Sequence, residues 1–335
     1  MSDFTKIVTD PEWILHRYDA ASDRFQFIHT SIDTIRSETF MADIKPLSDS
    51  HSMWVNAMEL TQISIPTVPV HFIFHTAFCR STLLVSALDI PSVSFGLSEP
   101  AVLNDLAMAG AKATRHVKTA LTLLARPIID AKTIIVKPSN VANNLIGPML
   151  QASPDSRALL LSGELPEFLQ SIHKKGLGGR TWARRLYRHV NRYSPLDLGL
   201  RGDGEFELTD LQVAALAWFL QQRHFAMLLH SLQCSRLETL MSNDLIDRRE
   251  AALLGVAHYF SLETDDARLS ELVRSDIFSR HAKLGGDYAE VVAAQSGAAR
   301  SPIVDDEIAM IEKWIDLIIT QTGLAIPVRK PVIER

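Results

Sequence analysis

The feature that most constrains the fold is an alternation of short apolar runs and helical stretches between residues 67 and 175. The run Val68-Pro69-Val70-His71-Phe72-Ile73-Phe74 is rich in β-branched and aromatic residues, as buried parallel strands are. Similar runs occupy residues 92–95, 133–136 and 158–161, and helices are expected over 81–88, 101–126, 139–151 and 165–175. This alternation predicts βαβ crossovers and a parallel sheet with helices on both faces.

The two flanks of this region lack such a pattern. Asp10-Pro11 is typical of a helix start, and four further helices are expected over 208–233, 247–260, 264–283 and 302–322. No strand is expected beyond residue 180. We therefore expect a helical N-terminal extension over residues 1–64, an α/β core over 65–180, and a helical C-terminal part over 181–335 packed on the core.

Composition excludes several classes of protein. Of 335 residues, 47% are apolar, which is enough for a large core. The net charge of −5 argues against a general nucleic-acid binder, and two cysteines cannot build a disulfide framework. The chain begins without a secretory signal and has no apolar run long enough to span a membrane. We expect a soluble, cytoplasmic protein.

The loop after the first expected strand is a candidate anion site, because ligands bind at the carboxyl ends of parallel strands. Its residues are His75, Thr76, Ala77, Phe78, Cys79, Arg80, Ser81 and Thr82. As a Walker phosphate loop it matches poorly, since Phe74 and Cys79 stand at the glycine positions. It still presents a cation, two hydroxyls and free amides at a helix start. The alternative is an ordinary turn with a solvated arginine.

Three separated elements carry a family resemblance: residues 72–84, Leu97-Ser98-Glu99-Pro100, and Pro166-Glu167-Phe168-Leu169-Gln170-Ser171. Together they resemble bacterial members of the sulfotransferase family of P-loop proteins. The resemblance implies a P-loop-type α/β fold and transfer of a sulfuryl group from the nucleotide donor PAPS to a hydroxyl acceptor. It also implies that residues 75–82 hold the 5′-phosphosulfate and that Ser171, at the start of a later helix, holds the 3′-phosphate.

The sequence departs from the family pattern at both ends of the nucleotide. The first loop has no glycine and its basic residue has moved by two positions. Gly163 stands eight residues before Ser171, where the family usually has arginine. Either Arg157 or the basic segment after Ser171, including Lys174 and Arg180, compensates, or the nucleotide differs.

Sulfuryl transfer needs a base for the acceptor proton and cations near the moving group. In several branches of the family a glutamate after the second strand is the base, and that role falls here to Glu99. The alternative for Glu99 is a helix N-terminal cap. Lys137 and Arg80 are the cations expected at the transferred group. Asn140, Asn143 and Asn144 are more typical of helix caps than of acceptor ligands. No metal is required by this chemistry.

Residues 171–192 form the densest charge feature of the chain. They hold seven cations and no acidic residue: Lys174, Lys175, Arg180, Arg184, Arg185, Arg188 and Arg192. The stretch is either part of an anion site, a surface for an anionic acceptor, or a solvated helix face.

Two other functions compete with this one. An ATP-dependent small-molecule kinase on a degenerate P-loop would need Mg²⁺ ligands after an apolar strand, and only Glu164 is loosely placed for that. A non-catalytic P-loop relic that binds a nucleotide or a partner protein is the second. We expect the acceptor to be a small molecule or the hydroxyl of a glycan or lipid. No recognisable motif encodes its identity or the oligomeric state.

Overall fold

The computed structural model describes residues 7–46, 48, 51–199, 204, 207–231, 234–274 and 302–333. In chain order its elements are β1 (Trp13–Asp19), β2 (Arg24–His29), α2 (Ile32–Ser37), η1 (Met41–Asp43), β3 (Ser52–Asn56), α3 (Ala57–Leu60), β4 (Val70–His75), α4 (Ser81–Ala87), β5 (Ser94–Ser98), α5 (Ala101–Ala109), α6 (Ala111–Thr114), α7 (Val117–Leu124), β6 (Thr133–Lys137), η3 (Asn140–Leu145), α8 (Ile146–Ala152), β7 (Ala158–Ser162), α9 (Leu165–Lys174), α10 (Gly176–Tyr193), α11 (Asp210–Leu229), η5 (Cys234–Arg236), β8 (Leu237–Met241), α12 (Asp244–Asp247), α13 (Arg249–Tyr259), α14 (Asp266–Arg274) and α17 (Pro302–Thr322).

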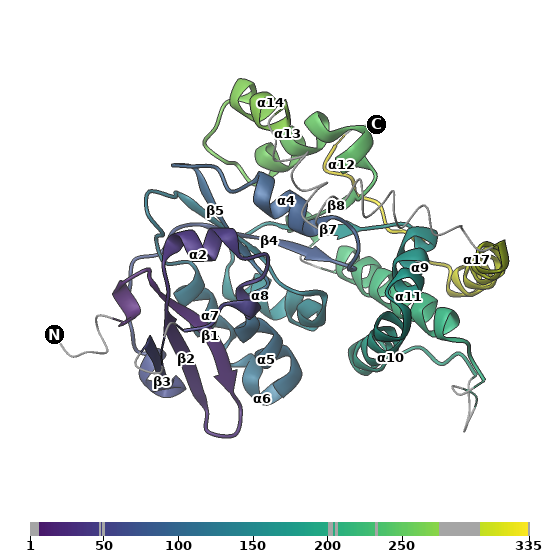
Figure 1. The fold of residues 1–335 in the computed structure, drawn as a ribbon, viewed down its shortest axis with the longest axis horizontal. Helices are drawn as coiled ribbons and strands as arrows, with labels where there is room; N and C mark the ends of the chain where they lie inside the picture. The colour runs from purple at the N-terminus through teal and green to yellow at the C-terminus, as the bar shows by residue number, and fades with distance from the viewer. Residues whose placement is uncertain are drawn as a thin grey trace. The chain divides into compact units, whose positions relative to one another are not determined.

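The central element is a five-stranded sheet with the order β5-β6-β4-β7-β8 (Figure 1). β6 pairs in parallel with both β4 and β5, and every side chain of β4 and β6 is buried. This burial on both faces explains why these strands are continuous apolar runs in the sequence. The predicted parallel sheet flanked by helices is confirmed.

The expected elements of this region form with two differences. The helix predicted over 139–151 is the 3-10 helix η3 followed by α8. The single helix predicted over 101–126 is three helices, α5, α6 and α7. Gly110, between α5 and α6, has φ 76°, a left-handed conformation that ends a right-handed helix.

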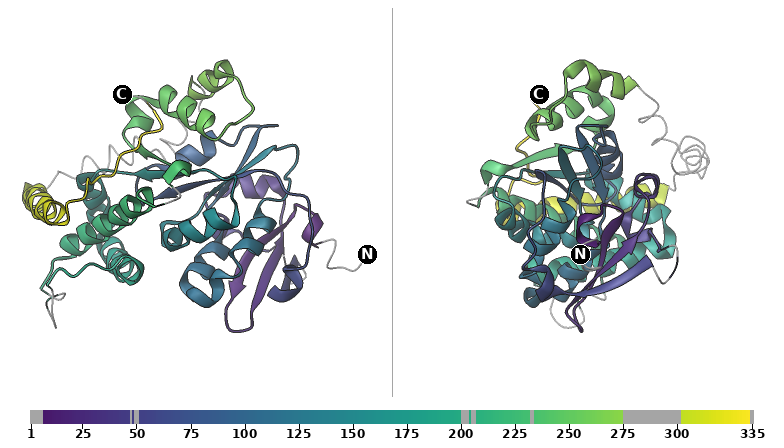
Figure 2. Two further views of the ribbon diagram at one scale, coloured as in Figure 1. Left: turned by 180° about the vertical axis from the view of Figure 1, so that it is seen from behind. Right: turned by 90° about the vertical axis from the view of Figure 1, so that its left-hand side faces the viewer.

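The prediction of a helical N-terminal extension over residues 1–64 is wrong. β1, β2 and β3 form a three-stranded antiparallel sheet, which Figure 2 shows from two sides. The Asp10 carboxylate accepts a hydrogen bond from the Glu12 amide, so Asp10 makes a turn and caps no helix. The segment that follows is rich in β-branched and aromatic residues and pairs with β2, burying Phe25 and Phe27 completely. Long-range pairing therefore outweighs the local helix signal.

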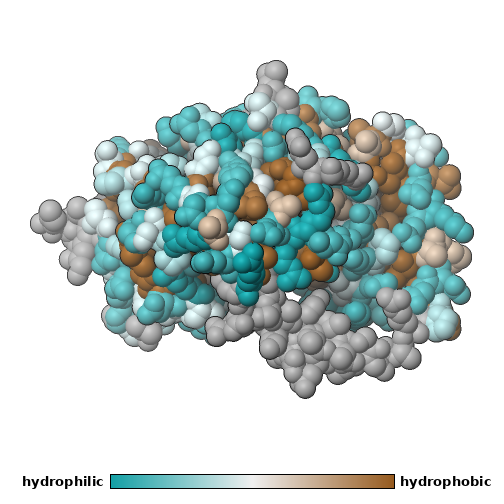
Figure 3. Space-filling model, turned by 90° about the horizontal axis from the view of Figure 1, so that it is seen from above, coloured by the Kyte–Doolittle hydropathy of each residue, from teal (hydrophilic) through white to brown (hydrophobic). Residues whose placement is uncertain are grey.

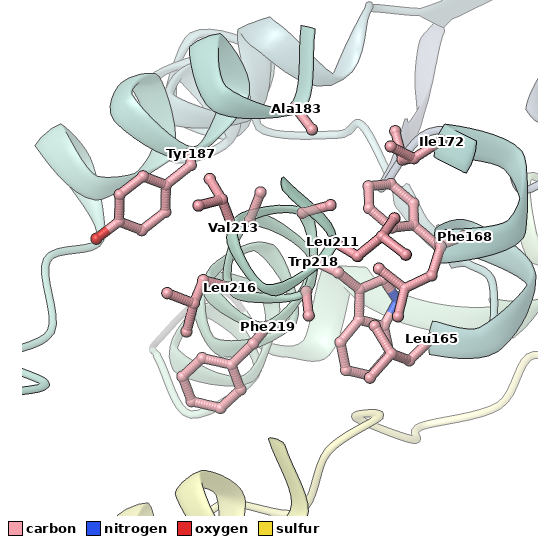
Figure 4. Packing of buried hydrophobic residues seen from close by; sticks show 14 of the residues in the cluster. Leu165, Phe168, Ile172, Ala183, Tyr187, Leu211, Val213, Leu216, Trp218 and Phe219 are labelled. Carbon is pink, nitrogen blue, oxygen red and sulfur yellow. The ribbon is translucent and has the colours of Figure 1, made fainter. Parts of the chain in front are cut away.

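The chain divides into two compact units. The first contains Met1–His75, Ser81–Leu159 and Leu253–Leu269, and the second contains Thr76–Arg80, Leu160–Ala252 and Ser270–Arg335. In the second unit, α9, α10, α11 and α17 share one hydrophobic core, in which Leu165 of α9 lies beside the Trp218 ring of α11 (Figure 4).

The C-terminal part is not wholly helical, because β8 adds a strand beside β7. Its five residues are too few to give a clear strand signal, although Leu237 and Leu240 are fully buried. The helices predicted over 208–233, 247–260 and 302–322 are α11, α13 and α17, and α14 covers part of 264–283, of which 275–283 lies outside the described residues. No helix in the described ranges combines the length and apolar character needed to cross a membrane.

Candidate functional site

Three strands of the parallel sheet bring charged and polar side chains to their carboxyl ends. His75 is the last residue of β4, Lys137 is the last residue of β6, and Glu99 directly follows β5. The Glu99 amide donates to the Lys137 carbonyl over 2.7 Å, so the two residues adjoin at the end of the β5–β6 ladder. The first unit thus gathers two of the residues predicted to act in catalysis.

The Lys137 side chain is fully buried. Its Nζ donates to Glu99 Oε1 over 2.5 Å and to Thr82 Oγ1 over 3.4 Å, and it lies 5.1 Å from the centroid of the Phe40 ring. A buried ammonium is stable only when its charge is compensated. Glu99 supplies that compensation, so the two residues form one ion pair. The sequence does not indicate the contact with Phe40, because Phe40 and Lys137 are far apart in the chain.

Glu99 does not cap a helix. The N-cap of α5 is Pro100, and no side chain caps that helix. Glu99 has φ 51°, a costly conformation for a residue other than glycine, and its side chain is 20% exposed. One carboxylate thus combines a buried cation as partner with access to solvent, and this combination suits a base better than a cap.

His75 lies beside this ion pair. Its Nε2 is 3.7 Å from Glu99 Oε1, and its carbonyl accepts from Asn143 Nδ2 over 3.0 Å. Burial, and then the positive charge of Lys137, hold the pKa of His75 well below its usual range, so the imidazole is neutral at pH 7. Asn143 therefore supports the end of β4, while Asn144 donates to the Ala107 carbonyl and Ser139 caps η3.

The loop between His75 and Ser81 adopts glycine-like conformations without glycine. Ala77, Phe78 and Arg80 have φ values of 70°, 49° and 62°. Each such residue costs of order 1–3 kcal/mol, and such strain gathers at ligand-binding loops. Left-handed residues in a turn also direct successive amides toward one side, as in anion-binding nests. The missing glycines of the sequence therefore do not prevent this backbone shape.

The other loop residues are mostly engaged in packing. Thr76, Cys79 and Ser81 are buried, and the Thr76 amide donates to the Leu161 carbonyl over 3.1 Å. Phe78 packs on Phe168 and Trp182. Hydrogen bonding thus fixes the start of this short turn, and aromatic packing fixes its middle, within the second unit.

Arg80 is held within the second unit. Its Nη1 lies 3.4 Å from Glu167 Oε2 and 3.3 Å from Ser242 Oγ, and its side chain is 32% exposed. An incoming anion would compete with a carboxylate for this guanidinium. The sequence does not indicate either contact, because Glu167 lies 87 residues and Ser242 lies 162 residues after Arg80 in the chain.

Gly163 has little space beside it. A Cβ at this position would lie 3.3 Å from Ser242 Oγ, so that hydroxyl would have to shift by a few tenths of an ångström, and 3.7 Å from the Cys79 Cβ, an ordinary contact. The arginine of the family pattern would therefore have to displace the Ser242 side chain at the end of β7. Arg157 does not replace it, because it precedes β7 at the opposite end of that strand and contacts the Tyr259 carbonyl and Ser261 Oγ.

Ser171 lies two turns into α9, not at its start. Its hydroxyl donates to the Glu167 carbonyl over 2.8 Å. Lys174, the last residue of α9, is exposed, and Arg180 in α10 lies 3.9 Å from Asp210 Oδ2. The structure places these three residues on α9 and α10 of the second unit, and the Asp210 carboxylate compensates part of the charge.

The basic stretch separates into two groups. Arg184 donates to Asp210 Oδ1 over 2.7 Å, as Arg180 does more weakly. Arg185, Arg188 and Arg192 are exposed on one face of α10 and have no ion-pair partner within the described residues. The second group is a free cationic surface.

The kinase candidate Glu164 is the N-cap residue of α9, and its Oε1 lies 3.9 Å from Arg329 Nη2. Across the described ranges, no three His, Cys, Asp or Glu side chains gather as a metal site.

Comparison with known proteins does not identify a family for this chain. No family model matches the chain, and no curated protein matches it. Among solved structures, a sulfotransferase domain from the curacin biosynthetic pathway aligns with 64% of this chain and 80% of its own, at 14% identity and a TM-score of 0.38. A score of this size does not establish a common fold.

Proposed function

We propose that the chain is a sulfotransferase-like enzyme that transfers a sulfuryl group from PAPS to a hydroxyl acceptor. The observation that supports this best is the buried Lys137–Glu99 ion pair at the carboxyl ends of β5 and β6, with Thr82 of α4 in contact with Lys137. In parallel sheets this edge is the usual place of ligand chemistry.

Each residue has a distinct role in the proposed reaction. The acceptor oxygen attacks sulfur and forms the new S–O bond, its proton passes to the Glu99 carboxylate, and the S–O bond to the phosphate breaks to release PAP. Lys137 positions Glu99 through the 2.5 Å contact. Arg80, Ser81, Thr82 and the amides of residues 75–82, apart from the Thr76 amide that already donates to the Leu161 carbonyl, bind the phosphosulfate, where cations offset the developing negative charge.

The 3′-phosphate end of the nucleotide fits less well, because Gly163 stands where the expected arginine would be and a side chain there would press on Ser242 Oγ. Ser171, Lys174 and Arg180 remain our candidates for this end. The free arginines Arg185, Arg188 and Arg192 suit an anionic acceptor, and the acceptor class we propose is a hydroxyl compound, glycan or lipid in the cytoplasm.

Calorimetric titration with PAP, with and without Mg²⁺, tests donor binding. We expect binding without Mg²⁺ that Arg80→Ala and Ser171→Ala each weaken about tenfold, since each removes a hydrogen bond to a charged group. Arg24→Ala and Ser37→Ala are the matched controls, because Arg24 is exposed and Ser37 repeats the hydroxyl-to-carbonyl contact of Ser171. Binding of ATP only with Mg²⁺ would favour the kinase, and binding of neither nucleotide would contradict both enzymes.

Transfer itself is tested with radiolabelled PAPS and a panel of hydroxyl compounds. Glu99→Gln keeps the shape of the side chain but cannot accept the proton, so PAP binding should persist while transfer is lost. Full activity of a folded Glu99→Gln variant would remove Glu99 from the mechanism.

A further inference from the structure

The C-terminal helix α17 exposes a stripe of large apolar side chains. Its buried face carries Ile308, Ile311, Ile315 and Ile318, which belong to the core of the second unit. On another face Ile303, Met310 and Leu317 are 78%, 66% and 64% exposed. Figure 3 shows that hydrophobic side chains are also exposed among the polar ones on the face that it draws.

The spacing makes these residues one stripe. They are seven positions apart, and seven residues return to within about 20° around a helix. At 1.5 Å per residue the stripe is about 21 Å long. Single exposed apolar residues are ordinary, whereas three large ones aligned along one helix form a surface that a second helix can cover.

The charges beside the stripe identify the partner. Asp306 lies four positions before Met310 and Lys313 three positions after it, on the same side of the stripe. Both side chains are exposed, and neither has an ion-pair partner within the described residues. Ile303 and Leu317 therefore lie at equal distances on the two sides of Met310. The negative Asp306 and the positive Lys313 lie at nearly equal distances on the two sides of it.

We propose that α17 pairs antiparallel with α17 of a second copy of this chain, about a two-fold axis at Met310. In this register Ile303 packs against Leu317 of the second copy, and Met310 packs against its own equivalent. Asp306 and Lys313 of opposite copies lie within about one helical rise of each other. A two-fold interface must be self-complementary in this way. A parallel pair would instead bring Asp306 against the other flank of the stripe in the second copy, where Glu307 lies, and two carboxylates side by side are unfavourable.

The proposal is independent of the enzymatic function and is tested by the oligomeric state. Light scattering after size exclusion, over a wide range of concentration, should show a reversible dimer. Met310→Glu places two carboxylates at the axis and should weaken dimerisation at least about a hundredfold, since juxtaposed like charges cost several kcal/mol. Met108→Glu is the control, because Met108 is 58% exposed on α5. A monomer at every concentration, or a dimer unaffected by Met310→Glu, would overturn the proposal.

Charge exchange and cross-linking test the direction of the pair. Asp306→Lys and Lys313→Asp should each weaken the dimer, and the double variant should restore it, which a merely structural role would not produce. On mild oxidation Met310→Cys should cross-link with itself, and Ile303→Cys should cross-link with Leu317→Cys. Cross-linking of Ile303→Cys with itself would indicate a parallel pair and contradict the antiparallel register.

Discussion

The Lys137–Glu99 ion pair makes the most demanding prediction, because its two members differ in burial. Lys137 is 0% exposed and Glu99 is 20% exposed. Glu99→Gln leaves an ammonium in the interior without its counter-charge and should lower the free energy of unfolding by about 3–5 kcal/mol. Lys137→Met leaves a carboxylate that water still reaches, so we expect a loss of about 1–3 kcal/mol.

The double variant separates a charge interaction from simple loss of packing. With Met at position 137 and Gln at 99 no charge remains buried, and replacement of a buried pair by uncharged groups is often nearly neutral. The double variant should therefore lose less than the two single variants together, by at least about 1 kcal/mol. Urea unfolding followed by tryptophan fluorescence at pH 7 measures all four proteins. Additivity within about 0.5 kcal/mol would refute the coupling, and with it the role of Lys137 in positioning Glu99.

Three further predictions concern the rest of the molecule. Arg126→Met should lower the free energy of unfolding by about 2–4 kcal/mol, because the buried guanidinium donates to five backbone carbonyls. The control is Arg115→Met, which should lower it by less than about 1 kcal/mol because the Arg115 side chain is 63% exposed. Equal losses of the two variants in urea unfolding would contradict this prediction. Burial, and then the charge of Arg157, lowers the pKa of His71 from 6.5 to about 4. Between these pH values the unfolded chain binds a proton at His71 and the folded chain does not. The free energy of unfolding should therefore fall as the pH drops from 6.5 to about 4. His71→Leu should reduce that loss in unfolding curves at the two pH values, and an unchanged pH dependence would count against it. Gly163→Arg should destabilise the protein without improving PAP affinity, because its Cβ would lie 3.3 Å from Ser242 Oγ; tighter binding in a stable variant would show that the end of β7 can accept an arginine.

Part of this fold follows from local sequence alone. The strands β4, β6 and β7 are read from apolar runs because both faces of each are buried, which removes polar residues from the pattern. The position of Glu99 and Lys137 at one edge follows as well, since the ends of parallel strands share an edge. The antiparallel N-terminal sheet was missed, because β1 depends on partners up to sixteen residues away and a local proline signal favoured a helix.

Periodicity and chain order are enough to predict the α/β class, the place of the loop after β4 and the residues that meet at the strand ends. The contacts that those residues make are visible only in the folded chain. Glu99 is bound to a buried lysine, Arg80 contacts a carboxylate of α9, and three residues of the loop take left-handed conformations without glycine. Such properties depend on burial and on partners distant in the chain, and no local pattern encodes them.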